Sequence, residues 1–362
     1  MNANPIQAVH QMVGNAGPGN SISNGARLLR RSLRAWGYRA DIYAETVAPA
    51  TSWGDVRPFR RYRPAPGDLL VVHYSQASAL IEYVRTLDVP VLLVYHNITP
   101  PRFFVGVNPA LVQATAQGRA QLPRLRDQTI LALADSDFNR RDLEAAGYKH
   151  SQVLPVLIPE TLSQTPPDPQ VAAHLNSGGG VNLLCVGRVA PNKRFEDVIK
   201  VLFYYRQIEP RARLFLVGNT ANTQPYVAWL RDFVAWLGLD EAVTFTDHVS
   251  DAALAAYYRG ADAFIYMSEH EGFGIPLVES MRFGAPVIAY AAAATPETLG
   301  GAGVLVTEKR FPVIAELVHL IQTDAQMRAR LIARQHERAR DFAPEQVLCR
   351  FRALLEEIAP QV

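Results

Sequence analysis

Three carboxylates and two glycines lie close together in the stretch SEHEGFGIPLVES, residues 268–280. The stretch follows an apolar run, AFIYM, and its proline suits the first turn of a helix, so Glu271 is expected in a loop and Glu279 about one turn into the helix. Gly272 and Gly274 would leave backbone N–H groups near the helix N-terminus, where phosphate or sugar oxygens bind. Because carboxylates repel anions and accept hydrogen bonds strongly from hydroxyls, the glutamates favour recognition of a polyol over acid/base chemistry.

Two cations follow another apolar run, VNLLCV, in the sequence GRVAPNK, residues 187–193. Arg188 can bind phosphate through two parallel hydrogen bonds, and Lys193 adds a mobile point charge. Both precede a predicted helix whose N-terminus favours anions, so the pair suits a diphosphate. The Walker pattern is absent, which excludes a P-loop. Ordinary surface cations are the alternative for this segment taken alone.

Two further segments follow predicted strands. Residues 13–24 contain three glycines, but their spacing departs from the dinucleotide-binding pattern, and a flexible turn is the alternative. In the second segment, HNITPP, His96 follows a buried strand and could hydrogen-bond a hydroxyl or help proton transfer near neutral pH. A structural role is the alternative for a lone histidine. No metal-ligand constellation stands out in the sequence.

Short apolar runs alternate with amphipathic stretches along the whole chain. Runs such as VPVLLVYH and APVIAY indicate buried parallel strands, and SNGARLLRRSLRAWGY indicates a helix that ends near Gly37. The alternation predicts doubly wound parallel sheets, in which ligands bind beyond the carboxyl ends of the strands. It breaks at residues 159–180, which are rich in proline, glycine and polar residues and which we interpret as a linker between two α/β units.

The composition is that of a globular enzyme-sized chain. Its 362 residues suit two domains, and 49% hydrophobic with 19% charged residues excludes a disordered protein. No apolar run approaches the roughly 20 residues that span a bilayer, no signal peptide is recognisable, and two cysteines are too few for a disulfide framework. We therefore expect a cytoplasmic protein. Two clusters of arginines suggest solvated surfaces, with contact to an anionic membrane surface as the alternative: Arg27, Arg30, Arg31, Arg34 and Arg57, Arg60, Arg61, Arg63.

These motifs together resemble a known family. The two glutamates Glu271 and Glu279, separated by seven residues, have the spacing that marks retaining glycosyltransferases of the GT-B fold, and VGRVAPNK resembles that family's donor-diphosphate motif. YHNITPP, GNSISN, ADSDFNRRDL and PVIAYAAAATPETLGGAGVLV are similar to the bacterial group of glycosyltransferase family 4 that builds surface polysaccharides, often with mannose- or rhamnose-type donors.

The resemblance implies an α/β chain of two Rossmann-like, doubly wound parallel-sheet domains facing across a cleft. Residues 1–165 would form an acceptor-binding domain and residues 166–341 a domain that binds the nucleotide-sugar donor. Residues 342–362 would form a C-terminal helix that crosses back and packs on the first domain.

It also implies roles for single residues. Arg188 and Lys193, in the motif that Gly187 begins, would hold the donor diphosphate and stabilise the leaving group, with no cofactor and no metal. Glu279 would accept hydrogen bonds from the ribose. Glu271, with the amides of Gly272, Phe273 and Gly274, would bind the hydroxyls of the donor sugar.

The remaining implied contacts come from other loops. His96 would lie near the transferred sugar, and Gly19 and Asn20 belong to a loop over the diphosphate or the acceptor. Many family members have Asp where this chain has Asn20, which removes a charge there. We expect Val249, in the segment TDHVS at residues 246–250, to help select the base through backbone contacts.

The implied activity is a retaining, metal-independent hexosyltransferase. It would move a hexose from a donor of the GDP-mannose or GDP-rhamnose type to a saccharide or lipid-linked saccharide, in the cytoplasm or at the inner face of the membrane and without nucleic acid. Two alternatives stay open: a nucleotide-sugar epimerase of the same fold, which needs no acceptor, and a non-catalytic nucleotide-sugar binding protein. The intact cations and glutamates argue against the second alternative.

Overall fold

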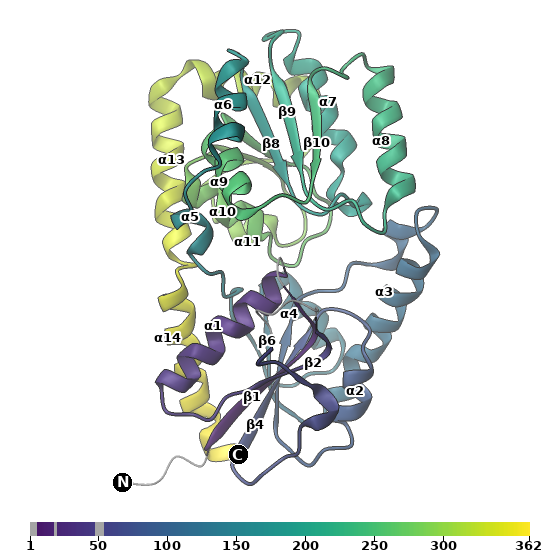
Figure 1. Cartoon of the computed structure of the whole chain (residues 1–362), viewed down its shortest axis with the longest axis vertical. Helices are drawn as coiled ribbons and strands as arrows, with labels where there is room; N and C mark the ends of the chain where they lie inside the picture. The colour runs from purple at the N-terminus through teal and green to yellow at the C-terminus, as the bar shows by residue number, and fades with distance from the viewer. Residues whose placement is uncertain (1–5, 18–19, 48–53) are drawn as a thin grey trace. The chain divides into compact units, whose positions relative to one another are not determined.

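The computed structural model describes residues 6–17, 20–47 and 54–362, and the chain divides into two units (Figure 1). Unit 1 comprises Met1–Pro101, Gln113–Pro159 and Phe342–Val362, and unit 2 comprises Arg102–Val112 and Glu160–Asp341. The turn η3 (Pro101–Phe104) and the helix α3 (Pro109–Gln121) carry the chain from one unit to the other and back.

Two features move the division away from the expected boundary at residues 165 and 166. Arg259 donates hydrogen bonds of 2.9 Å to the carbonyl oxygens of Ser163 and Thr165, so this short segment belongs with unit 2. Asn108 donates a hydrogen bond of 2.9 Å to the carbonyl of Asn222, which attaches residues 102–112 to unit 2 as well.

Unit 1 is built on a parallel sheet of seven strands in the order β3-β2-β1-β4-β5-β6-β7. The strands are β1 (Ala8–Ala16), β2 (Ile42–Val47), β3 (Arg57–Pro58), β4 (Asp68–Tyr74), β5 (Val91–Tyr95), β6 (Thr129–Ala134) and β7 (Ser151–Val153). The helical elements, apart from η3 and α3, are α1 (Ser21–Ala35), η2 (Phe59–Arg61), α2 (Ala79–Val84), η4 (Leu122–Leu125), α4 (Asp137–Ala145), α14 (Pro344–Ile358) and η6 (Ala359–Gln361).

The first strand is longer than predicted. We expected a loop from residue 13, but β1 continues to Ala16 because Asn15 and Ala16 pair with Thr46 and Val47 of β2, a strand that the sequence analysis missed. The helix that follows is confirmed: α1 ends at Ala35, and Gly37 behind it adopts a φ of 94°.

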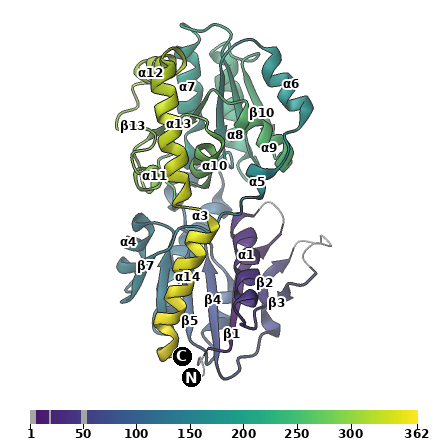
Figure 2. The same ribbon diagram turned by 90° about the vertical axis from the view of Figure 1, so that its left-hand side faces the viewer.

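The C-terminal segment is helical, as predicted, and packs within unit 1. Phe351 and Leu355 of α14 are buried in one apolar cluster with Leu33 of α1 and Val71 of β4. Figure 2 shows α14 lying along the strands of this sheet.

The arginines of α1, which were expected on a solvated surface, are not all exposed. Arg30 is only 5% exposed and forms an ion pair with Asp55.

Unit 2 is built on a parallel sheet of six strands in the order β10-β9-β8-β11-β12-β13. The strands are β8 (Asn182–Val186), β9 (Arg213–Val217), β10 (Val243–Asp247), β11 (Ala263–Tyr266), β12 (Val287–Tyr290) and β13 (Val304–Val306). The helical elements are α5 (Thr161–Gln164), α6 (Pro169–Ser177), η5 (Pro191–Lys193), α7 (Phe195–Tyr205), α8 (Gln224–Trp236), α9 (Asp251–Arg259), α10 (Ile275–Phe283), α11 (Thr295–Leu299), α12 (Phe311–Thr323) and α13 (Ala325–Arg340).

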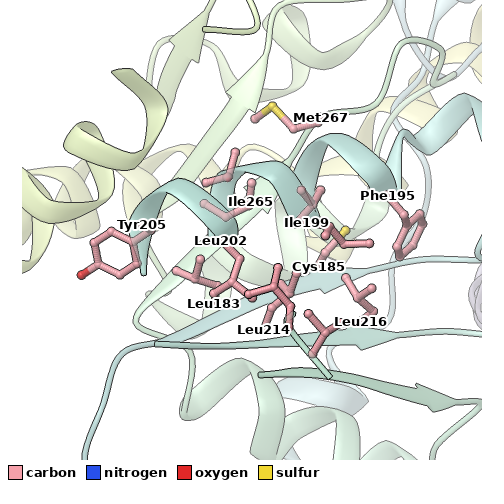
Figure 3. Close-up of a cluster of buried hydrophobic side chains, with 14 of the residues drawn as sticks. Leu183, Cys185, Phe195, Ile199, Leu202, Tyr205, Leu214, Leu216, Ile265 and Met267 are labelled. Atoms are coloured by element: carbon pink, nitrogen blue, oxygen red, sulfur yellow. The ribbon is translucent and has the colours of Figure 1, made fainter. Parts of the chain in front are cut away.

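The core of unit 2 lies under α7. Ile199 and Leu202 of this helix are fully buried against Leu214 of β9 and Ile265 of β11 (Figure 3). Each such side chain contributes about 1.5–3 kcal/mol when it leaves water. This packing fixes the start of α7, and with it the loop from β8 that carries the predicted cations.

The boundary between the two units falls at the start of the predicted linker, between Pro159 and Glu160, but the rest of residues 159–180 belongs to unit 2 and is not a break in regular structure. These residues contain α5 and α6, and Asp168 caps α6 by accepting hydrogen bonds of 2.8 Å and 3.1 Å from the amides of Gln170 and Val171. One of the prolines that suggested a break, Pro169, stands at the start of α6, where a proline fits.

Both sheets reverse their strand order once, as predicted for doubly wound folds. The reversal lies between β1 and β4 in unit 1 and between β8 and β11 in unit 2. Loops that follow the strands at such a point flank the usual binding crevice of an open parallel sheet. Within the described residues, no helix is long and apolar enough to cross a membrane.

Candidate functional site

Two glycines bring the ends of β8 and β9 together in unit 2. Gly187 and Gly218 have φ values of 146° and 154°, and a Cβ atom on Gly218 would lie 2.0 Å from the carbonyl oxygen of Gly187. The Gly187 amide in turn donates to Val217 at 2.9 Å. Only glycine is compatible with this close backbone approach, which sets the path of the loop 187–194.

The loops that follow β8 and β11 meet in an ion pair. The Lys193 ammonium lies 2.7 Å from Oε1 of Glu271, and the two side chains are only 14% and 13% exposed. The Lys193 ammonium also lies 5.5 Å from the ring centre of Tyr266, the last residue of β11. The structure thus brings together two of the predicted site residues at the point where the strand order reverses.

Arg188 stands beside this pair without a carboxylate partner. Among the described residues no Asp or Glu oxygen lies within salt-bridge distance of its guanidinium. The guanidinium carbon lies 6.0 Å from the centre of the Phe104 ring. Arg188 is exposed to solvent, yet desolvation by the protein around it lowers its pKa, and the nearby Glu271 partly offsets that effect. An arginine stays charged under these conditions, so the site holds a cation that is available to an anion.

The glutamate loop is fixed by backbone and side-chain hydrogen bonds. Asn192 donates to the carbonyl of His270 at 3.0 Å, and the amide of Glu269 donates to the carbonyl of Asn192 at 2.8 Å. Further along, the hydroxyl of Thr298 donates to the carbonyl of Phe273 at 2.5 Å. The loop therefore holds its position through contacts that leave the Glu271 carboxylate to Lys193.

Glu269 has a structural role. Its carboxylate lies 2.8 Å from Lys309 and 3.3 Å from Arg194. Lys309 also binds Asp197 at 2.8 Å; burial would raise the pKa of Asp197, but Lys309 and Lys200 bring it below the ordinary value. This network explains one of the three carboxylates in the stretch 268–280 without assigning it a ligand.

The second glutamate of the motif lies on α10. Gly274, with a φ of 94°, occupies the N-cap position of this helix without a side-chain cap, and Glu279 follows within the helix. The hydroxyl of Tyr258 donates a 2.8 Å hydrogen bond to Oε2 of Glu279. Burial raises the pKa of Glu279, and this hydrogen bond partly opposes the shift. This hydrogen bond uses Oε2 and leaves Oε1 of the carboxylate able to accept from another donor.

The other predicted donor residues lie in loops. Gly272 is half-buried in the glutamate loop, and Val249 is half-buried between β10 and α9. Asn20 caps α1 in unit 1, where its side chain accepts a 3.1 Å hydrogen bond from the amide of Ser23. Gly19 lies outside the described residues. The roles proposed for these four residues stay predictions.

Unit 1 carries a different arrangement, in which four polar residues form one continuous chain. Oε1 of Gln11 lies 3.0 Å from Nε2 of His73, and Nδ1 of His73 lies 3.0 Å from Nε2 of His96. Nδ1 of His96 is 3.0 Å from Asp135, and the side chains of His96 and Asp135 are 9% and 4% exposed. The four residues come from or directly follow the neighbouring strands β1, β4, β5 and β6.

The direction of this chain follows from hydrogen-bond chemistry. Nε2 of Gln11 donates to the carbonyl of Ala26 at 2.9 Å, so the Gln11 oxygen faces His73 and must accept. Nε2 of His73 is then the donor, its Nδ1 accepts, and Nε2 of His96 donates to it. One further proton therefore lies between Nδ1 of His96 and Asp135.

The pKa shifts agree with a buried chain that has no net charge. The surrounding protein, together with His96, holds the pKa of His73 well below its usual range. Burial raises the pKa of Asp135, and His96 opposes that shift. Both ring nitrogens of His96 are bound to protein groups, and the proposed contact of His96 with a transferred sugar stays a prediction.

Sequence reasoning missed several of these residues. Asp135 is the last residue of the predicted strand TILALAD, so the rule that ligands bind at strand ends could have drawn attention to it. Tyr258 and Phe104 gave no comparable signal, because their contacts with Glu279 and Arg188 join segments far apart in the sequence. The residues that the structure describes contain no group of three or more His, Cys, Asp or Glu that could hold a metal ion.

The comparison with protein families agrees with the geometry of unit 2. Residues 170–338 match the family described as "Glycosyl transferases group 1". The match includes Arg188, Lys193, Glu271 and Glu279. The free arginine, the lysine–glutamate pair and the glutamate on α10 thus all belong to the matched domain.

Relatives of known name match the chain in part. A D-inositol 3-phosphate glycosyltransferase from Stackebrandtia nassauensis is 30% identical over 51% of this chain and 46% of its own length. A GDP-mannose-dependent alpha-(1-6)-phosphatidylinositol monomannoside mannosyltransferase from Mycolicibacterium smegmatis is 29% identical over 37% of each chain. The chain thus matches less than half the length of these two relatives.

A solved structure shows the same fold over the whole chain. The structure of Anabaena HepE in complex with UDP and glucose superposes with a TM-score of 0.76 and 18% identity, covering 97% of this chain and 100% of that chain. The prediction of two parallel-sheet α/β domains of the GT-B type is confirmed by this likeness together with the two sheets described above.

Proposed function

We propose that the protein is a retaining glycosyltransferase of family 4 that moves a hexose from a nucleotide-diphosphate sugar to a saccharide or lipid-linked saccharide. One observation carries the proposal. Beside the β8–β11 reversal, within the domain that matches group 1 glycosyl transferases, Arg188 has no carboxylate partner and Lys193 has only Glu271. A pair of cations at this position is suited to a diphosphate.

The roles of the residues follow from their chemistry. Arg188 and Lys193 bind the diphosphate and stabilise the negative charge that develops when the bond between the sugar C1 and the phosphate oxygen breaks. Glu279, oriented by Tyr258, accepts hydrogen bonds from the ribose. Glu271 accepts hydrogen bonds from the sugar hydroxyls. The acceptor oxygen attacks C1 on the face that the diphosphate leaves, and a departing phosphate oxygen takes the acceptor's proton.

Unit 1 is proposed to bind the acceptor, and unit 2 the donor. The relative named for GDP-mannose supports a GDP-linked donor of the mannose or rhamnose type. The neighbour solved with UDP and glucose makes UDP-glucose the first competitor to test. The proposed reaction uses neither a cofactor nor a metal, because the two cations supply the positive charge that the leaving group needs.

A thermal-shift panel with UDP-, GDP- and dTDP-sugars tests the proposal. We expect one nucleotide series to raise the melting temperature of the wild-type protein and not that of a variant that combines Arg188→Ala and Lys193→Ala. Product analysis by NMR then separates transfer from epimerisation, since a transferase forms a new glycosidic bond with retained configuration. Equal shifts in the wild type and the double variant would contradict the donor site.

A further inference from the structure

Once a nucleotide-sugar donor is present, Lys193 can pair with either of two anions, the Glu271 carboxylate or the donor diphosphate. In the structure its ammonium lies 2.7 Å from Glu271, and among the described residues it has no other carboxylate in contact. Arg188 has none. The two cations therefore differ: one is available to a ligand at once, and the other must first leave its resident partner.

We propose that the Lys193–Glu271 ion pair is an exchange element that makes the site favour an intact nucleotide sugar over the free nucleoside diphosphate. This inference rests on the proposed function, because it assumes that the diphosphate binds at Arg188 and Lys193. A diphosphate that takes Lys193 leaves the Glu271 carboxylate without its cation. That carboxylate, 13% exposed, then needs another donor.

Of the two ligands, the intact nucleotide sugar supplies such donors and the free nucleoside diphosphate does not. The hydroxyls of the sugar can replace Lys193 at the carboxylate, since a hydroxyl donates well to an ionised oxygen. A free nucleoside diphosphate has no sugar to offer, carries more negative charge and leaves Glu271 unpaired. A partly buried charge that loses its partner is costly, so the released product binds less tightly than the donor that was consumed.

The surroundings of Glu271 limit its other ways of being paired. The hydroxyl of the buried Tyr266 lies near Glu271 without a hydrogen bond of normal geometry, and as a neutral donor it replaces only part of the positive charge that Lys193 supplies. The cations Lys309 and Arg194 are already paired with Glu269, which lies two residues before Glu271. Neither neighbour offers Glu271 a second cation when Lys193 moves to a phosphate.

Calorimetric titration with nucleoside diphosphates and with the matching nucleotide sugar tests the exchange. Glu271→Gln is expected to bind the nucleoside diphosphate about three- to tenfold more tightly than the wild type, since the ion pair no longer competes. The nucleotide sugar should gain no affinity. Glu316→Gln removes an exposed carboxylate from α12 and is the control, with unchanged affinity for both ligands.

A second background separates exchange from simple repulsion between Glu271 and the phosphates. In Lys193→Ala the ion pair is already absent, so adding Glu271→Gln should give a clearly smaller gain than it gives in the wild type. An equal gain in both backgrounds would overturn the exchange. Unchanged or weaker binding of the nucleoside diphosphate by Glu271→Gln would overturn it too, and Glu271→Ala must agree if the glutamine variant melts early.

The failure of the exchange and the failure of the proposed function look different. If Arg188→Ala weakens the nucleoside diphosphate but Glu271→Gln gains nothing, the donor site stands and the exchange falls. If the wild type binds no nucleoside diphosphate among UDP, GDP, ADP and dTDP, both fall.

Discussion

At the carboxyl edge of the unit 1 sheet, Gln11, His73, His96 and Asp135 bond to one another, and no nitrogen of the two histidines is left over. At the equivalent edge in unit 2, by contrast, Arg188 has no carboxylate partner. Both edges follow parallel strands beside a reversal of strand order. The difference shows that polar residues at a strand end do not by themselves make a binding site. The polar groups of unit 1 bond to one another, whereas unit 2 has an arginine that no carboxylate neutralises.

Electrostatics explains why the polar chain of unit 1 and the two cations of unit 2 are both stable. The unit 1 chain can stay buried because its four side chains share protons and carry no net charge. Unit 2 has two cations for one carboxylate, and it tolerates them because Arg188 is open to solvent while Lys193 has Glu271. Unit 2 therefore gains more from an arriving anion than unit 1 does.

The largest expected effect comes from removing one of the two cations of the unit 2 site, Lys193. Lys193→Ala should lower turnover by an amount equivalent to about 2–4 kcal/mol of transition-state stabilisation, as for one lost oxyanion donor. The melting temperature should also fall, because Glu271 loses its partner, but this loss of about 1 kcal/mol should be smaller than the loss of transition-state stabilisation. Steady-state rates together with thermal melts measure both quantities.

Lys149→Ala is the matched control for this change. Lys149 is exposed on unit 1 and forms no ion pair among the described residues, so its removal should leave both turnover and stability unchanged. Near wild-type turnover in Lys193→Ala would contradict the assignment of this lysine to the leaving group.

The next effect concerns stability and breaks the satisfied chain in unit 1. Asp135→Ala leaves Nδ1 of His96 buried without a partner and should lower the free energy of unfolding by about 1–3 kcal/mol. Asp135→Asn should cost less, because the amide can donate to that nitrogen as a protonated carboxyl does. Urea unfolding of both variants compares them, and an asparagine variant as unstable as the alanine variant would point to a charged His96–Asp135 pair instead.

A smaller effect is expected at Glu279, a half-buried carboxylate in unit 2 that has one hydrogen bond from Tyr258. Glu279→Gln should weaken the nucleoside diphosphate by about 1 kcal/mol, the difference between a charged and a neutral acceptor, while the hydrogen bond from Tyr258 can persist. Because burial raises the pKa of Glu279, the affinity of the wild type should fall as the pH decreases toward that raised pKa. Calorimetry at several pH values should show a flatter profile in Glu279→Gln, and equal affinities and profiles would argue against the ribose contact.

The sequence was informative where a single segment carries the structure. Pro276 was expected in the first turn of a helix with Glu279 about one turn in, and both lie in α10 (Ile275–Phe283) as expected. The alternation of apolar runs predicted both parallel sheets, because buried strands need continuous apolar side chains. Arg188 and Glu271 were placed in loops after strands, where the structure has them, and Lys193 ends the short turn η5 that follows β8.

The sequence was silent where contacts join distant segments. β2 was missed because IYAETV is short and its outer half is polar, and its pairing with β1 is decided by the sheet rather than by either strand alone. The helix α6 was hidden by Pro169, which starts this helix instead of ending one, and α5 has only four residues. The neutral chain from Gln11 to Asp135 joins four strands, so no local pattern could have revealed that His96 has both nitrogens occupied.

The binding of a nucleoside diphosphate to wild type and to Arg188→Ala is the measurement that tests the central claim most directly. The base is the one selected by the thermal-shift panel, and Arg330→Ala, which removes an exposed arginine from α13, is the control. We predict that calorimetry finds binding to the wild type and to Arg330→Ala with equal affinity, and binding at least about tenfold weaker to Arg188→Ala, as for the loss of a charge-assisted hydrogen bond. Equal affinities in all three proteins would contradict the assignment of the unpaired arginine to the donor diphosphate.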